Sequence, residues 1–283
     1  MTRVALTLGV DVGATTIVTG LVDVDTGEIH SSRSTASEVH RGGAAVLEDC
    51  VRLARQLADP APAAVGISVC EAVDLEGHVT SAFSFDWRHT DVAGAFADIA
   101  PACVDSDVRA AALAEAVWGT GRRHASFLYV NAGSGISSTL VVDGTPYAGA
   151  HGNAILIGAG PIDAEAAASG TALRRRHGVS GLDLARAAEA GDRAAERILE
   201  EAGGVLGEAI AFAVNLVDPE VVVVGGGLAL GSETYSSAAE AAMRKHIWAE
   251  SAKAIPFLGG DLGTDAALLG AALTASTRLL GSR

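Results

Sequence analysis

The stretch "LGVDVGATTIVTGLVDVDTGEI", residues 8–29, decides the fold. Its alternating apolar residues predict the two strands of a hairpin, and the Asp-Thr-Gly that follows is typical of a second tight turn into a third strand. The opening of the chain, residues 3–35, is therefore predicted to be an antiparallel meander of three strands. Asp11 stands among apolar residues at the end of the first strand, with small and hydroxyl residues at the turn after it. A carboxylate at such a place needs a chemical explanation, because burying an unpaired charge is costly.

A similar pattern starts again near residue 126. The stretch "FLYVNAGSGISSTLVVDGTPYAG", residues 127–149, contains a strand, a turn of small residues, an alternating strand and an Asp-Gly turn. In both places a hydrophobic strand leads into a glycine turn and then into a second strand that an Asp-Gly type turn closes. Such internal similarity predicts two lobes of related design.

The spacing of apolar residues, together with glycines and prolines that end helices and strands, predicts the secondary structure of the rest of the chain. A buried strand is predicted at 63–69, and residues 102–118 are predicted to run from a short strand into an Ala-rich helix with Ser106 as its N-cap. Near the C-terminus, "EVVVVGGGLA" predicts an apolar strand that runs into three glycines. The other predicted helices are 43–58, 163–176, 183–216 and 264–280.

Composition excludes several classes of function. Among 283 residues, 20 are basic and 34 acidic, for a net charge of −14, which argues against a nucleic-acid or anionic-membrane partner. No apolar run reaches membrane-spanning length, and the opening residues pass directly into a strand pattern, which argues against a signal peptide. Cys50, Cys70 and Cys103 are odd in number and have no C-x-x-C spacing, so neither a disulfide framework nor a zinc knuckle is indicated. A reduced cytoplasm is the predicted location.

Three glycine turns are candidates for holding phosphate through backbone N–H groups and hydroxyls. They are "DVGATT" at 11–16, "AGSGISS" at 132–138 and "GGG" at 225–227. None matches the P-loop pattern or the Gly-x-Gly-x-x-Gly of a dinucleotide fold. Each is a weak signal alone in a chain with 34 glycines, and it is their order that carries weight.

That order resembles the ROK family of the actin-like ATPase superfamily. The family's Asp-x-Gly-Gly-Thr hairpin corresponds to Asp11–Thr15, with Ala14 at the second glycine, and its Gly-Ile-Gly-x-Pro-Gly strand is matched only in part by "VGISVCEAVD" at 65–74. Its Glu-Asn-Asp-x-Asn-Ala-Ala-Ala segment corresponds to residues 105–112, in which Ser106 replaces the first Asn and Arg109 stands at the second.

The resemblance continues to the end of the chain. The family's Gly-Thr-Gly-Ile-Gly turn corresponds to 133–137, its Gly-Asn-Ala-Gly-Glu-Ile-Gly-His segment to "GNAILIGAG" at 152–160, and its Glu-x-x-x-Ser-Gly stretch to "EAAASG" at 165–170. "PEVVVVGGGLA" and "DAALLGAA" are similar to its last two elements. The resemblance therefore covers nearly the whole chain, in order.

The resemblance implies an α/β fold, a two-lobed actin-like ATPase (RNase H-like) architecture with an interdomain cleft. The expected domains are residues 1–107 with 265–283 for the N-terminal lobe and 108–264 for the C-terminal lobe. Hinge closure is expected to exclude water from the γ-phosphate. Family members commonly form dimers through the second lobe, so a homodimer is expected.

The resemblance also implies roles for individual residues, with ATP and Mg²⁺ as cofactors. Asp107 corresponds to the catalytic base, and its place at a helix N-terminus is expected to keep it ionised at neutral pH. Asp11 is the carboxylate that faces Mg²⁺, through water. The expected substrate-binding residues are Ser106, Asp107, Asn153 and Glu165. The expected nucleotide-binding residues are Asp11, Gly13, Ala14, Thr15, Thr16, Gly133, Ser134, Gly225, Gly226 and Gly227.

The departures from the family pattern bear on the substrate. Leu156 and Ala159 stand where typical members have a Glu that binds sugar hydroxyls and a His that contacts the sugar and ligates zinc. The cysteine-rich zinc loop is missing, so no zinc site is expected. Leu and Ala put apolar side chains where the family has side chains that form hydrogen bonds with the sugar, which argues against ordinary glucokinase activity. Replacement contacts could come from His151, Arg88 or His89, although such residues more often lie on surfaces or in turns.

Two functional hypotheses remain open. One is an ATP-dependent kinase that phosphorylates a hydroxyl of a small polyhydroxy compound, a cyclitol such as a C7-cyclitol, or a modified sugar, in preference to plain glucose. The other is a non-catalytic regulatory protein, derived from a ROK kinase, that binds a sugar or a nucleotide. The retained Asp11 and Asp107 favour the kinase, because a protein that only binds its ligand has little need of both.

Overall fold

The computed structural model describes residues 6–281, so the predicted strand start at 3–5 and residues 282–283 lie outside the description. It contains two compact units, each with a five-stranded mixed sheet and its own apolar core. The first unit comprises the chain up to Gly119, Pro146–Ala154 and the chain from Asp265 onward, and the second comprises Thr120–Thr145 and Ile155–Thr264. The first unit thus continues past residue 107, where the sequence predicted a domain boundary, because the helix that begins there packs against the C-terminal helix.

The sheet of the first unit has the strand order β3-β2-β1-β4-β5. Its strands are β1 (Leu6–Val12), β2 (Thr16–Asp23), β3 (Glu28–Ala36), β4 (Val65–Val69) and β5 (Ala102–Ser106). The first three pair antiparallel, which confirms the predicted meander, whereas β4 and β5 continue the sheet in parallel with β1. Because three parallel strands lie side by side, their carboxyl ends meet at one edge of this sheet.

The second sheet repeats the plan of the first. Its order is β10-β9-β6-β7-β8, with β6 (Ser126–Ala132), β7 (Ile136–Val142), β8 (Thr145–Pro146), β9 (Val221–Gly225) and β10 (Phe257–Gly259). Strand β6 takes the place of β1: it pairs antiparallel with the next strand in the chain and parallel with a later one. The two units therefore share one topology, as the internal similarity of the sequence predicted.

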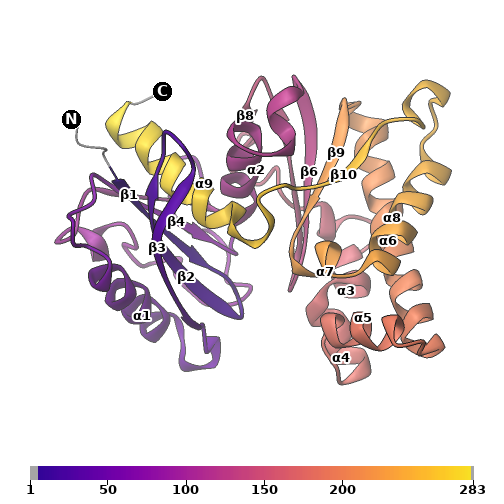
Figure 1. Ribbon diagram of the computed structural model, residues 1–283, viewed down its shortest axis with the longest axis horizontal. Helices are drawn as coiled ribbons and strands as arrows, with labels where there is room; N and C mark the ends of the chain where they lie inside the picture. The colour runs from indigo at the N-terminus through magenta and orange to yellow at the C-terminus, as the bar shows by residue number, and fades with distance from the viewer. Residues whose placement is uncertain (1–5, 282–283) are drawn as a thin grey trace. The chain divides into compact units, whose positions relative to one another are not determined.

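Helices cover both faces of the first sheet. They are α1 (Gly43–Gln56), α2 (Asp107–Val117) and α9 (Ala266–Ala275), and Figure 1 shows α9 returning from the end of the chain to lie beside β1 and β4. Alternate residues of a strand face opposite sides. Val10 belongs to the core under α1, whereas Gly66 faces α9, where a Cβ would lie 1.7 Å from the carbonyl oxygen of Ala271. Helix α9 can approach this sheet so closely only because glycine leaves the space.

The helices of the second unit differ in part from the prediction. They are α3 (Ala164–Ala168), α4 (Gly170–His177), α5 (Gly181–Glu189), α6 (Arg193–Val217), α7 (Gly227–Leu230) and α8 (Glu233–His246). The ranges 163–176 and 183–216 are helical as predicted, but each of them contains two helices. Ser169 and Asp192 accept hydrogen bonds from backbone N–H groups as N-caps, and each starts a new helix. No helix among residues 6–281 is long and apolar enough to cross a membrane.

Two adjacent glycines on α6 provide a matched test of packing in the second unit. A Cβ at Gly203 would lie 2.2 Å from the carbonyl oxygen of Tyr235 on α8, whereas a Cβ at Gly204 would have no neighbour within 4 Å. We expect Gly203→Ala to lower the free energy of unfolding by about 1–3 kcal/mol through overpacking. Gly204→Ala is expected to raise it by about 0.5–1 kcal/mol, because alanine favours the helix. Urea unfolding measures both, and equal effects of the two substitutions would contradict this packing.

Candidate active site

Asp11 lies near the carboxyl end of β1, on the face of the sheet that α9 covers. Its register partner on β4 is Ser68, whose hydroxyl donates a 2.8 Å hydrogen bond to Oδ1 of Asp11 and also reaches the carbonyl oxygen of Ala267 on α9. The carboxylate is half-buried and forms no ion pair among residues 6–281. The polar end of the hairpin is thus a carboxylate that is held in place by one hydroxyl, with no cationic side chain paired to it in the described part of the chain.

Asp107 is the first residue of α2, directly after β5. Because Val12, Val69 and Ser106 are in register at the ends of β1, β4 and β5, the chain delivers Asp107 to the same sheet edge as Asp11. Oδ1 of Asp107 accepts a 2.6 Å hydrogen bond from the backbone N–H of Val108. The first unit therefore brings together the two carboxylates to which the family resemblance assigns metal and base roles.

The two carboxylates are hard to ionise. Desolvation raises the pKa of Asp11 to about 6, and the hydrogen bond from Ser68 offsets part of that effect. The pKa of Asp107 is raised to about 7, first by desolvation and then by the charges of Asp11 and Glu71. The expectation that the helix N-terminus keeps Asp107 fully ionised at neutral pH is corrected, because burial and the neighbouring carboxylates outweigh the helix.

The pair suits a divalent cation. Two half-buried carboxylates with raised pKa values and no ion-pair partner in the described chain form an acidic site that a cation would stabilise. Oxygen ligands are those that Mg²⁺ prefers, and Mg²⁺ commonly uses only one or two carboxylates and keeps several waters. No cluster of three or more His, Cys, Asp or Glu side chains that could hold a metal occurs among the described residues.

The raised pKa values make the pair a source of instability at alkaline pH. An acid whose folded-state pKa lies above its unfolded value stabilises the fold only below the unfolded pKa, and that contribution is lost as the pH rises through the folded value, here about 6 and about 7. We expect Asp107→Asn in metal-free buffer to raise the free energy of unfolding by about 1–3 kcal/mol at pH 8 and by much less at pH 5. Urea unfolding at both pH values measures this. A variant less stable than the wild type at pH 8 would contradict it.

Ser106 and Asn153 also lie in the first unit. Ser106 occupies the N-cap position of α2, but its side chain makes no capping bond, so the predicted capping role is corrected. Its Oγ is buried and has no hydrogen-bond partner in the described structure. Asn153 is exposed and belongs to the segment Pro146–Ala154, which packs with the first unit.

Glu71 is a residue of this site that the sequence analysis missed. Its buried carboxylate accepts hydrogen bonds from the Ser81 hydroxyl and from the backbone N–H groups of Phe83 and Ser84, at 2.7 and 2.6 Å for the two backbone donors. It thereby fixes the loop after β4 and adds negative charge near Asp107. The available signal was a departure from the family pattern, since Glu71 stands where the family has the Gly of Pro-Gly.

The first glycine turn closes the hairpin from Gly13 to Thr16. The N–H of Gly13 donates to the carbonyl oxygen of Thr16, while Ala14 is half-buried and Thr15 and Thr16 are exposed. The buried Ser37 holds this turn in place with two hydrogen bonds. Its hydroxyl donates to the carbonyl oxygen of Gly13 at 2.6 Å, and its backbone N–H donates to the carbonyl oxygen of Thr15. The turn is therefore rigidly held while its threonines remain open to a ligand.

The second unit gathers the other two glycine turns. The carbonyl oxygens of Gly133 and Ser134 accept hydrogen bonds from the backbone N–H groups of Gly170 and Thr171, respectively, at the start of α4. Residues 225–227 lie against this turn, since a Cβ at Gly226, where φ is +89°, would lie 2.5 Å from the carbonyl oxygen of Ala132. Gly227 is half-buried, and a Cβ there would have no neighbour within 4 Å. Such free space beside a glycine turn suits a phosphate or ribose group.

Glu165 lies in the second unit and bonds to the same turn. Its Oε2 accepts a 2.6 Å hydrogen bond from the backbone N–H of Ile136, directly after the glycine turn. The residues that replace the family's Glu and His, Leu156 and Ala159, are both exposed. Of the suggested replacement contacts, Arg88 forms an ion pair with Asp86 on the surface, and His89 and His151 are exposed.

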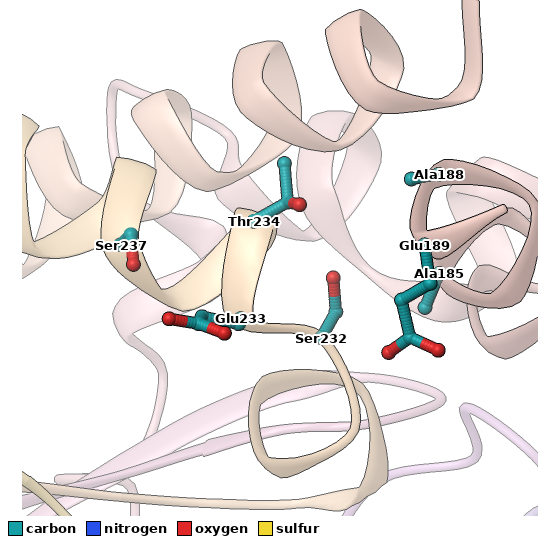
Figure 2. Close-up of a pocket in the computed structure, with 7 residues that line it drawn as sticks. All are labelled: Ala185, Ala188, Glu189, Ser232, Glu233, Thr234 and Ser237. Carbon is teal, nitrogen blue, oxygen red and sulfur yellow. The ribbon is translucent and has the colours of Figure 1, made fainter. Parts of the chain in front are cut away.

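The second unit also contains a pocket of about 200 Å³. Figure 2 shows it between α5 and the start of α8, with the side chains of Glu189 and Glu233 at its border. Its lining residues are Ala185, Ala188, Glu189, Ser232, Glu233, Thr234 and Ser237. None of the residues assigned to the site from sequence lines it.

Two units of one repeated topology, with paired carboxylates at a sheet edge in the first and glycine turns in the second, define an actin-like ATPase fold. Within this class the chain belongs to the ROK family, whose model matches residues 7–278.

Known relatives include kinases and regulators. The glucokinase of Thermotoga maritima is 27% identical in an alignment 312 positions long, which covers 97% of this chain and 98% of that protein. The crystal structure of a ROK family glucokinase from Streptomyces griseus in complex with glucose and AMPPNP superimposes with a TM-score of 0.87 at 25% identity, covering 96% of this chain and 99% of that one. A transcriptional regulator of Mycobacterium bovis is 31% identical over 257 residues, which cover 78% of this chain and 58% of that protein.

Proposed function

We propose that this protein is an ATP-dependent kinase that phosphorylates a hydroxyl group of a small polyhydroxy compound. The observation that carries the proposal is the pair Asp11 and Asp107, two half-buried carboxylates at one sheet edge, where desolvation and the charge of Asp11 raise the pKa of Asp107. A catalytic base works best when its pKa lies near the working pH. The similarity to named kinases along the whole chain supports the same reaction class.

In this proposal Asp107 orients the acceptor hydroxyl and accepts its proton during transfer. Its hydrogen bond with the N–H of Val108 fixes one oxygen, which stabilises the carboxylate form in which it acts. Asp11, held by Ser68, would hold Mg²⁺ through water. Bound Mg²⁺-ATP supplies the phosphoryl group and offsets the charge that develops on it.

The remaining roles are divided between the units. We assign acceptor binding to Ser106, Asn153 and Glu165, in addition to Asp107. Exposed hydroxyls of the Gly13–Thr16 turn and backbone groups of Gly133–Ser134 would hold phosphates, and Gly225–Gly227 the nucleoside, because these turns offer donors without a bulky side chain. The hydroxyl of Ser106 is buried and has no hydrogen-bond partner among the described residues, which supports its assignment to acceptor binding.

The acceptor we propose is a cyclitol, such as a C7-cyclitol, or a modified sugar, in preference to plain glucose. The exposed Leu156 and Ala159 offer apolar surface where a hexose would need hydrogen-bond partners. Each hydroxyl left without a partner would cost roughly 1–3 kcal/mol. An acceptor with fewer or differently placed hydroxyls avoids that loss.

The test is Mg²⁺-ATP turnover with glucose, deoxy and amino sugars, myo-inositol and an unsaturated C7-cyclitol. We expect a higher kcat/KM for a cyclitol or a modified sugar than for glucose. The double variant Leu156→Glu with Ala159→His is expected to raise kcat/KM for glucose, because it restores the two polar side chains. Preference of the wild type for glucose would contradict the acceptor assignment.

A regulatory function is the second candidate, favoured by the similarity to the mycobacterial regulator. In that case the protein binds a sugar or a nucleotide without transferring phosphate. The two candidates separate in one comparison of the wild type with Asp107→Asn. Absence of turnover with every acceptor, together with unchanged ligand binding in the variant, would favour the regulatory function.

A further inference from the structure

The segment Pro146–Ala154 has an unusual place in the fold. The chain on both sides of it belongs to the second unit, but the segment itself packs with the first unit. It carries Asn153, which the proposed function assigns to acceptor binding, whereas the base Asp107 lies on α2 of the first unit. Something must therefore hold the segment to the unit that contains the base.

Arg109 makes the contacts that can do so. It lies on α2, two residues after Asp107, and is only 4% exposed. Its Nη1 donates a 2.6 Å hydrogen bond to the carbonyl oxygen of Gly152, and its Nη2 a 2.8 Å bond to that of Val73 in the loop after β4. Its Nε donates to Oδ1 of Asp105 at 2.6 Å, so the buried charge is balanced. One guanidinium thus joins α2, the loop after β4 and the 146–154 segment.

Gly152 lets the segment come close enough for these bonds. Its φ is +75°, and a Cβ there would lie 2.0 Å from the carbonyl oxygen of Val73. The two carbonyl oxygens that Arg109 binds therefore belong to two chain segments that pack directly against each other. Without the guanidinium, each of these two buried carbonyl oxygens would lose the donor of its hydrogen bond.

We propose that Arg109 is a positioning residue, which fastens the 146–154 segment and its Asn153 to the unit that carries Asp107. The inference rests on the proposed function, because only there does Asn153 bind the acceptor. The residue at this position of the family motif is Asn. An amide donates from a single nitrogen, whereas a guanidinium donates in several directions at once, so this chain holds the segment in a way that the family residue cannot.

Arg109→Met tests the inference, with Arg278→Met as the matched control. Arg278 also binds Asp105, and its Nη1 donates a 3.3 Å hydrogen bond to the carbonyl oxygen of Val104 on β5 rather than to Gly152. In Arg109→Met we expect hydrogen exchange of the amides in residues 150–154 to accelerate by about tenfold or more, while the amides of α1 keep their wild-type rates. We expect the KM for the acceptor to rise by about tenfold with the KM for ATP unchanged. Arg278→Met is expected to leave both quantities unchanged.

Several outcomes would overturn the inference. One is unchanged exchange in residues 150–154 of Arg109→Met, and another is equal acceleration over the whole first unit, which indicates general destabilisation. Arg109→Lys keeps the charge beside Asp105 but replaces the three donor nitrogens that bind Asp105, Gly152 and Val73 by a single one. It therefore provides the same test where the Met variant does not fold. Exchange also separates the two proposals. A wild type that phosphorylates no acceptor contradicts the proposed function, whereas the exchange result decides whether Arg109 holds the segment.

Discussion

Asp107→Asn is expected to lower kcat by roughly 10²–10⁴, the range that a positioned general base contributes. Asparagine keeps the size of the side chain and its place at the start of α2, but its amide cannot accept the proton of the acceptor hydroxyl. ATP and acceptor should bind with affinities within a few-fold of the wild type. Steady-state kinetics with the best acceptor, together with calorimetric binding, measure the two quantities.

The control for this substitution is Asp98→Asn. Asp98 also lies in the first unit, but it is exposed, and its ion pair within the described part of the chain is with Arg55 on the surface. Its substitution should leave kcat unchanged. A kcat for Asp107→Asn within about threefold of the wild type would remove Asp107 from the role of base, since loss of a base has a much larger effect.

Asp105→Ala is expected to lower the free energy of unfolding by about 3–5 kcal/mol, because it leaves a buried guanidinium without its partner. Asp105 and Arg109 are paired at 2.5 Å, with side chains only 7% and 4% exposed. Arg278 also forms an ion pair with Asp105, so one substitution removes the ion-pair partner of two arginines. Urea unfolding measures the change.

The matched control is Asp98→Ala, which breaks an exposed Asp–Arg pair of the same unit with side chains 57% and 60% exposed. Surface pairs contribute about 0–1 kcal/mol, so this variant should unfold close to the wild type. Equal losses in the two variants would contradict the view that burial of the Asp105–Arg109 pair is what makes it important.

The sequence was sufficient to predict the strand order of each hairpin and the repeat. Alternation of apolar residues with Asp-Gly type turns determines local pairing, and the same pattern around residues 127–149 marked the second unit. The helix boundaries were less predictable. In an Ala-rich stretch, Ser169 and Asp192 each fit a helix interior and a cap, and only tertiary packing decides between them.

The site was predictable only where a residue belongs to a pattern. Asp11 and Asp107 were found through their place in the family motifs, and the sheet brings both to one edge. Glu71 and Arg109 were missed because their partners are loop carbonyl and N–H groups that lie far along the chain. The pKa of Asp107 depends on burial and neighbouring charges, which the helix N-terminus alone does not reveal.

The proposed chemistry requires that Asp11 and Asp107 form one coupled site. Carboxyl carbon NMR titration of Asp107 in metal-free buffer, in the wild type and in Asp11→Asn, tests this directly. We predict an apparent pKa of about 7 in the wild type and a lower value in Asp11→Asn, because the charge of Asp11 raises the pKa of Asp107. An Asp107 that titrates near 3.8 in both proteins would contradict the account.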